Sequence, residues 1–184
     1  MIRAKELYEI ISKEWETKKS EIPWDAKNPV WTKWIKDYFT KLGKDRGFKV
    51  ESSRLPSGNG EGEYLVDACW WKKQTNQYWL ELIVESEWDS SSGEIEQDFY
   101  KLIDIKAYLK VWICSWSDNQ YQKREKLLSD LVAQTRFKIP EEEYLIINLP
   151  FNKESNYKDS LLIYSFWMNN MGEPNILQTK EIRR

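Results

Sequence analysis

Near the start of the chain, apolar residues recur every three or four positions in two stretches, and this spacing predicts two amphipathic helices. The first covers residues 2–17. The second begins at Asn28, where an asparagine N-cap followed by Pro29 favours helix initiation, and it ends near Gly43. A solvated helix face is the default for the acids of these helices, but three of them could reach a site: Glu14, Glu16 and Asp37.

Alternation of apolar and polar residues then predicts strands. A short strand is expected at 48–52. Two longer ones, at 64–71 and 78–87, are joined by the polar segment 72–77, which is typical of a β-hairpin. The period of two places four residues of the third strand on one face, namely Glu81, Ile83, Glu85 and Glu87. The other face of this strand is apolar enough to lie in the core.

The second half of the chain predicts strands that alternate with helices. Ser91 and Glu94 fit a capping box at the start of a helix, and the almost continuously apolar run 110–116 is expected to be a strand buried on both faces. A helix, two strands and a tail that shows no pattern and is expected to fray complete the chain: 119–137, 144–149, 161–168 and 169–184. These elements predict one α/β domain over residues 1–184, with a mixed sheet flanked by helices.

Composition narrows the chemistry. The chain has no histidine, which excludes histidine-based triads, histidine-liganded zinc and imidazole acid–base catalysis in this chain. Its two cysteines, Cys69 and Cys114, are too few for a four-cysteine zinc site and are expected to be buried free thiols. Catalysis would have to use carboxylates, lysine, tyrosine, cysteine or a metal ion held by oxygen. Because the net charge is −2, nucleic-acid binding would need a local basic patch.

The beginning of the sequence is amphipathic and rich in acids, unlike a signal peptide, and no apolar run approaches the roughly 18 residues of a membrane span. Free cysteines are typical of a reducing compartment. We therefore expect a soluble, cytoplasmic protein with no membrane partner.

Acidic residues are disfavoured in strands, so the acids of the predicted hairpin require an explanation. In a hairpin of about this register, Asp67 lies opposite or diagonal to the level of Ile83 and Glu85, with Cβ atoms roughly 5–8 Å apart. Two carboxylates at that separation could share one divalent cation. A slip of one residue would place them on opposite faces. The acids could equally form the wet face of an edge strand, balanced by neighbouring lysines.

The segment VDACWW carries Asp67, and LIVESEW carries Glu85 with Ser86 next to it; the helix SGEIEQDFYKL follows. This arrangement resembles the PD-(D/E)xK nuclease superfamily, the fold of many restriction endonucleases and repair nucleases. It implies a restriction endonuclease-like three-layer α/β/α domain with a mixed central sheet. The resemblance covers about residues 28–116, with 1–27 as an N-terminal helix and link and 117–168 as a peripheral helix and strands.

Two positions depart from the family pattern. Val66 stands where the family has a proline that is often missing. Glu87 stands where the lysine of the second motif is expected, as it does in some restriction endonucleases. In some relatives this lysine comes from the following helix, and Lys101 is the candidate for such a migration here.

The resemblance also implies a site and a substrate. Asp67, Glu85 and the backbone carbonyl of Ser86 would hold Mg²⁺ or Mn²⁺, in an oxygen-only set suited to a hard cation. Glu87 would extend the metal site or accept a proton from water, and Lys101 would stabilise negative charge on a phosphodiester of DNA or RNA. Gln97 would orient water or phosphate. Four lysines are candidate phosphate contacts: Lys72, Lys73, Lys106 and Lys110. Homodimers are common in the family.

A second hypothesis belongs to another class, a nuclease-like fold without catalysis that serves as a protein- or nucleic-acid-binding module. The low basicity, the missing lysine and the 11 tryptophans favour it. Several tryptophans fall at core positions, but a surface surplus would suit stacking on bases or on a protein. A third hypothesis, a nucleophilic enzyme using Cys114 or Ser115, lacks a histidine base and lies in a run that is expected to be buried.

Overall fold

A computed structural model describes residues 1–24, 26–52, 66–88, 92–116, 120–149 and 160–184. Its helices are α1 (Ala4–Thr17), α2 (Asn28–Asp45), α3 (Ser92–Asp104) and α4 (Tyr121–Gln134), with a short 3₁₀ turn, η1, at Lys19–Glu21. The strands follow in chain order: β1 (Lys49–Ser52), β2 (Ala68–Gln74), β3 (Gln77–Glu87), β4 (Leu109–Cys114), β5 (Glu143–Asn148), β6 (Ser160–Asn169), β7 (Pro174–Ile176) and β8 (Lys180–Arg183). Ser91 of the predicted capping box lies outside the described residues.

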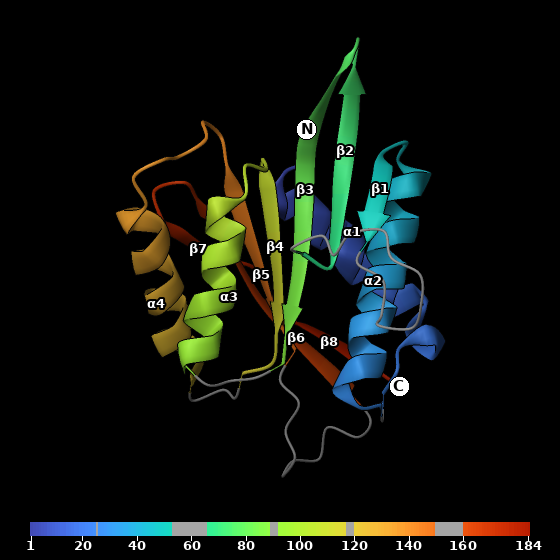
Figure 1. The fold of residues 1–184 in the computed structure, drawn as a ribbon. Helices are drawn as coiled ribbons and strands as arrows, with labels where there is room; N and C mark the ends of the chain where they lie inside the picture. The colour runs from blue at the N-terminus through green and yellow to red at the C-terminus, as the bar shows by residue number, and fades with distance from the viewer. Residues whose placement is uncertain (25, 53–65, 89–91, 117–119, 150–159) are drawn as a thin grey trace.

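The strands form one mixed sheet in the order β1-β2-β3-β4-β5-β6-β7, with β8 paired to β6 (Figure 1). The pairs β3–β4 and β4–β5 are parallel and every other pair is antiparallel. Parallel neighbours need a crossover connection, and α3 and α4 supply it. The prediction of an α/β fold with a mixed sheet and flanking helices is therefore confirmed.

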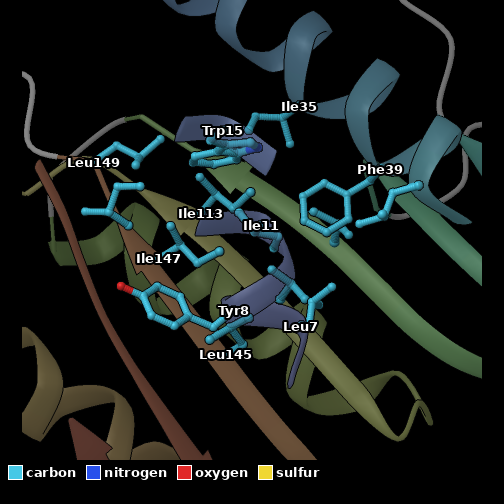
Figure 2. Packing of buried hydrophobic residues seen from close by; sticks show 14 of the residues in the cluster. Leu7, Tyr8, Ile11, Trp15, Ile35, Phe39, Ile113, Leu145, Ile147 and Leu149 are labelled. Carbon is cyan, nitrogen blue, oxygen red and sulfur yellow. The ribbon is translucent and has the colours of Figure 1, made fainter. Parts of the chain in front are cut away.

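Helices cover both faces of the sheet, as the two clusters of buried side chains show. On one face, Ile11 and Trp15 of α1 and Phe39 of α2 pack with Ile113 and Ile147 of the sheet (Figure 2). α3 and α4 cover the other face, where, for example, the rings of Phe99 and Trp112 meet edge to face with centroids 5.3 Å apart.

The tryptophans supply much of this core. Five of them are almost completely enclosed: Trp15, Trp31, Trp70, Trp112 and Trp116. The largest exposed tryptophan surface belongs to Trp79 on β3, which is 42% exposed beside Tyr78. The expectation that part of the aromatic content is core is confirmed.

A β-bulge changes the faces of β3. Trp70 pairs with Leu82 but Trp71 pairs with Leu80, which makes Glu81 the extra residue. Leu80 packs on the α3/α4 side and Leu82 on the α1/α2 side, while the buried carboxylate of Glu81 accepts a hydrogen bond of 3.0 Å from the backbone N of Ile2. The prediction that Glu81 shares a face with Glu85 was wrong, because it assumed an uninterrupted period of two.

Two boundaries also differ from prediction. β2 continues to Gln74 and β3 begins at Gln77, so the hairpin turn is Thr75 and Asn76 instead of the whole segment 72–77. The tail 169–184, predicted to have no regular element, contains β7 and β8. Both strands pair with β6, and this pairing supplies the order that local sequence did not reveal.

Candidate functional site

The β2–β3 register brings two predicted acids together. Ala68 pairs with Val84, so Asp67 lies opposite Glu85 one step further along the antiparallel pair. The backbone N of Asp67 donates a hydrogen bond of 3.0 Å to Oε2 of Glu85. The expected proximity of Asp67 and Glu85 is confirmed.

The carboxylate of Asp67 is fixed on both of its oxygens. Oδ2 accepts hydrogen bonds from the backbone N and the Oγ of Ser86, at 2.9 and 2.5 Å. Oδ1 lies 3.0 Å from Nζ of Lys36. Because Asp67 is only 9% exposed, these partners take the place of water around its charge.

Lys36 is the residue of this site that sequence reasoning missed. It lies on α2 next to the fully buried Ile35, and its side chain is 13% exposed. Of the three acids considered on these helices, Asp37 pairs with Lys33 on the same helix, Glu14 accepts a hydrogen bond from Tyr38, and Glu16 is exposed. A lysine that flanks a buried helical stripe is a weak signal, since long side chains at such positions usually extend to solvent.

Glu85 is held in an unfavourable setting for a carboxylate. Burial, and then the charge of Asp67, raise its pKa to about 8, against the opposing effects of the Asp67 N–H and of Lys101. Near neutral pH this carboxyl therefore carries a proton. A cation placed between Asp67 and Glu85 would favour the ionised form.

Lys101 reaches the same region from α3. Its ammonium pairs with Asp98 one turn earlier, and this hydrogen bond is the main cause of its raised pKa. The charges of Glu85 and Glu87 raise that pKa further, which places the lysine within their electrostatic reach. Lys101 thus pairs with Asp98 and also lies within the electrostatic reach of Glu85 and Glu87.

The other predicted residues lie elsewhere. Gln97 is exposed on α3. Lys72 and Lys73 are exposed near the hairpin turn, with Lys72 five residues from Asp67, or about 17 Å along the strand. Lys106 is exposed after α3. Among the described residues, none of these side chains has a hydrogen bond or ion pair with the two carboxylates.

Lys110 is enclosed by the protein. It is 1% exposed, its ammonium pairs with Glu142, and it donates hydrogen bonds to the carbonyl of Ile103 at 2.9 Å and to the Tyr144 hydroxyl at 3.3 Å. Burial lowers its pKa. A phosphate contact requires an accessible ammonium, so the predicted phosphate contact at Lys110 does not fit the structure.

The donor set around Asp67 fits a hard divalent cation only in part. Within the described residues, no group of three or more aspartate, glutamate, cysteine or histidine side chains could hold a metal ion. Asp67 and Glu85 offer two carboxylates, and the backbone carbonyl of Ser86 beside them on β3 would be a further oxygen ligand. Two carboxylates with backbone oxygen suit Mg²⁺, which usually keeps several waters.

The cysteines are buried and free, as predicted. Burial raises the pKa of the Cys69 thiol to about 11 and that of Cys114 well above its ordinary value. Since the thiolate is the nucleophile, Cys114 is unsuited to covalent catalysis near neutral pH.

Comparison of this chain with protein-family models, with curated proteins and with solved structures found no match. In the part of the chain that the structure describes, none of the helices has the length and apolar character needed to cross a membrane.

Proposed function

We propose that this protein is a metal-dependent nuclease that hydrolyses phosphodiester bonds of DNA or RNA at the site formed by Asp67 and Glu85. The observation that carries the proposal is the direct contact between these residues, which hold two carboxyl groups at the end of β3 with one of them protonated near neutral pH. Charged groups that are crowded and desolvated in this way are typical of functional sites.

The order of elements supports the same proposal. α2, β1, β2, β3, α3 and β4 follow one another, with β1–β2–β3 antiparallel and β4 parallel to β3. This order of a helix, an acidic hairpin, a helix and a strand agrees with the resemblance to the PD-(D/E)xK superfamily, in which we propose that the two acids serve as metal ligands.

Each residue has a role in the proposed reaction. Asp67 and Glu85 would hold Mg²⁺, with the backbone carbonyl of Ser86 as a further ligand. Ser86 also fixes Asp67 through its two hydrogen bonds. The ion would lower the pKa of a bound water and neutralise charge on the phosphodiester. Lys101 would stabilise that charge, and Glu87 would accept a proton from water.

A binding module without catalysis is the second candidate, and the Lys36–Asp67 contact favours it. The ammonium already neutralises Asp67, and the proton neutralises Glu85, so the cluster is electrically satisfied without a metal ion. In a nuclease, the cation would have to displace the Lys36 ammonium from Asp67 or bind to Asp67 alongside it. The two functions therefore differ in whether a divalent cation competes successfully with this lysine.

Calorimetric titration of Mn²⁺ into the protein separates the two functions. The nuclease proposal expects saturable binding that is lost in Asp67→Asn and in Glu85→Gln and retained in Asp45→Asn, whose exposed carboxylate on α2 pairs with Lys41. The same proteins are then incubated with supercoiled circular DNA and with single-stranded RNA, with Mg²⁺ or with chelator. Mg²⁺-dependent cleavage that both site variants abolish supports the nuclease. Absent binding, with intact circular dichroism, supports the module.

A further inference from the structure

A cavity of about 880 Å³ lies away from the two carboxylates. The carboxyl end of α3, the connections that follow α3 and α4, and residues at or next to the starts of β4 and β5 line it. In Figure 1 the carboxyl ends of α3 and α4 lie at the same end of the sheet, opposite the end at which β3 stops. The cavity shares no lining residue with the site formed by Asp67 and Glu85, so what it binds is a separate question. Its volume falls within the range of small-molecule sites, about 300–1,000 Å³.

Aromatic and aliphatic side chains form much of the wall. They come from α3 and from the two connections that follow α3 and α4: Tyr100, Ile103, Ile105, Phe137, Ile139 and Pro140. Phe137 is 90% exposed and Tyr100 is 45% exposed. An exposed phenylalanine ring leaves its apolar surface in water, and a flat ligand that covered it would recover that free energy.

Cationic side chains surround this apolar wall. Lys106, Arg136 and Lys138 line the cavity, and within the described part of the chain none of them has an acid at ion-pair distance. Lys138 donates only to the carbonyl of Ala133, at 3.1 Å, and to the sulfur of Met171. The three cations therefore favour a ligand that carries negative charge.

Two acids also line the cavity, and they limit the choice of ligand. Glu142 forms a buried ion pair with Lys110, so its negative charge is already compensated within the protein. Asp104 has no cationic partner within ion-pair distance among the described residues and can accept hydrogen bonds. A ligand with an anionic end, an aromatic body and hydroxyl or amino donors matches all three features.

We infer that this cavity binds a nucleoside phosphate. The base stacks on Phe137 and Tyr100, the phosphate is held by Lys106, Arg136 and Lys138, and Asp104 accepts a hydrogen bond from a ribose hydroxyl or from a base amino group. The inference is independent of the proposed nuclease activity, since it involves none of the residues of that site.

Binding is measured with the full chain by ¹H–¹⁵N NMR, using adenosine monophosphate as the probe, with adenosine and inorganic phosphate as separate arms. The inference expects saturable shifts of amides in the Thr135–Pro140 connection and around Ile105, and weaker binding of both fragments than of the nucleotide. Phosphate alone binding as tightly as the nucleotide would overturn it, because the base would contribute nothing. Adenosine binding as tightly would overturn it too, because the cations would contribute nothing.

Variants test whether the named side chains hold the ligand. Arg136→Gln combined with Lys106→Gln removes two cations and is expected to weaken nucleotide binding about tenfold or more, since charge-assisted hydrogen bonds are the strong ones. Phe137→Ser should weaken it severalfold, and this exposed position tolerates the change without loss of fold. Lys123→Gln, an exposed lysine on α4, is the control and should leave binding unchanged. Affinity that is the same in all variants, or the absence of saturable shifts, contradicts the inference.

Discussion

Two pairs of lysine and acid in this molecule have nearly the same chemistry and different surroundings. Lys110 and Glu142 are both buried, and the lysine has two further hydrogen-bond acceptors in Ile103 and Tyr144. Lys36 and Asp67 are partly accessible and lie beside a second carboxyl, Glu85, whose pKa is raised to about 8. The first pair satisfies its own charges, whereas the second leaves an acid that is held neutral. We therefore expect the first pair to contribute to stability, and the proposed function rests on the second.

Breaking the enclosed pair should have the largest effect. Glu142→Gln leaves the ammonium of Lys110 buried without its counter-charge, which typically costs about 3–5 kcal/mol of the free energy of unfolding. Urea denaturation measures the loss. Replacing both partners, as Lys110→Met with Glu142→Leu, should recover part of it, because no charge is then buried although the Tyr144 hydroxyl loses its acceptor. If Glu142→Gln is as stable as the parent protein, water reaches Lys110, and the two pairs do not differ in how much they contribute to stability.

At the second site, the effect of removing an acid on the free energy of unfolding should depend on pH. In the folded state the pKa of Glu85 is about 8, whereas the ordinary pKa of a glutamate is 4.5. The protonated form therefore contributes its full stability below the ordinary pKa. This contribution is lost as pH rises through the folded-state pKa. A tenfold change in proton affinity between the folded and unfolded states corresponds to about 1.4 kcal/mol. Glu85→Gln should therefore match the parent near acidic pH and exceed it by a few kcal/mol in alkaline buffer with chelator.

Urea denaturation of both proteins across this range is the measurement, and Glu181→Gln, at an acid that is only paired to the exposed Arg183, is the control. If the parent and Glu85→Gln unfold with parallel pH profiles, the Glu85 carboxyl is not held neutral in the folded state.

Binding of Mn²⁺ should release a proton from Glu85. Because the carboxyl is protonated below about pH 8, the apparent affinity should rise about tenfold for each step of one in pH below that value and level off above it. Calorimetry in buffers of different ionisation enthalpy counts the released proton, which should be close to one near neutral pH. Binding without proton release would show that the ion contacts Asp67 without engaging Glu85.

The smallest effect is expected from the lysine that competes with the ion. Lys36→Gln removes a cation 3.0 Å from Oδ1 of Asp67, so Mn²⁺ affinity should increase by about a few-fold, because the ion no longer competes with the ammonium for that oxygen. Lys33→Gln, one turn earlier on α2 and paired with Asp37, should leave affinity unchanged. Equal affinity in the two variants would mean that Lys36 does not occupy the cation position.

The parts of this site that sequence predicted are those set by periodicity. Alternation in two neighbouring strands, with a polar turn between them, predicted that Asp67 lies close to Glu85, but it predicted neither the bulge nor the two-residue turn that set the observed register. Lys36 could not be predicted in the same way, because its contact depends on how α2 packs over the sheet. Glu81 was misplaced for a related reason, since a single extra residue in β3 reverses the face that it occupies. The cavity combines residues from α3 and from two connections, and no local pattern relates them.

The start of α1 depends on strands that are far away in the chain. Its N-cap residue, Arg3, offers no side-chain cap; instead the backbone N of Ala4 donates to Glu143 on β5 at 2.7 Å, and that of Ile2 donates to Glu81 on β3. The first turn of the helix is thus completed only when β3, β4 and β5 are already side by side. Such long-range closure slows folding, because the entropy of a large loop is lost before the contacts form. We therefore expect α1 to dock late, after the central strands have assembled, and its first amides to be the last protected from hydrogen exchange during refolding.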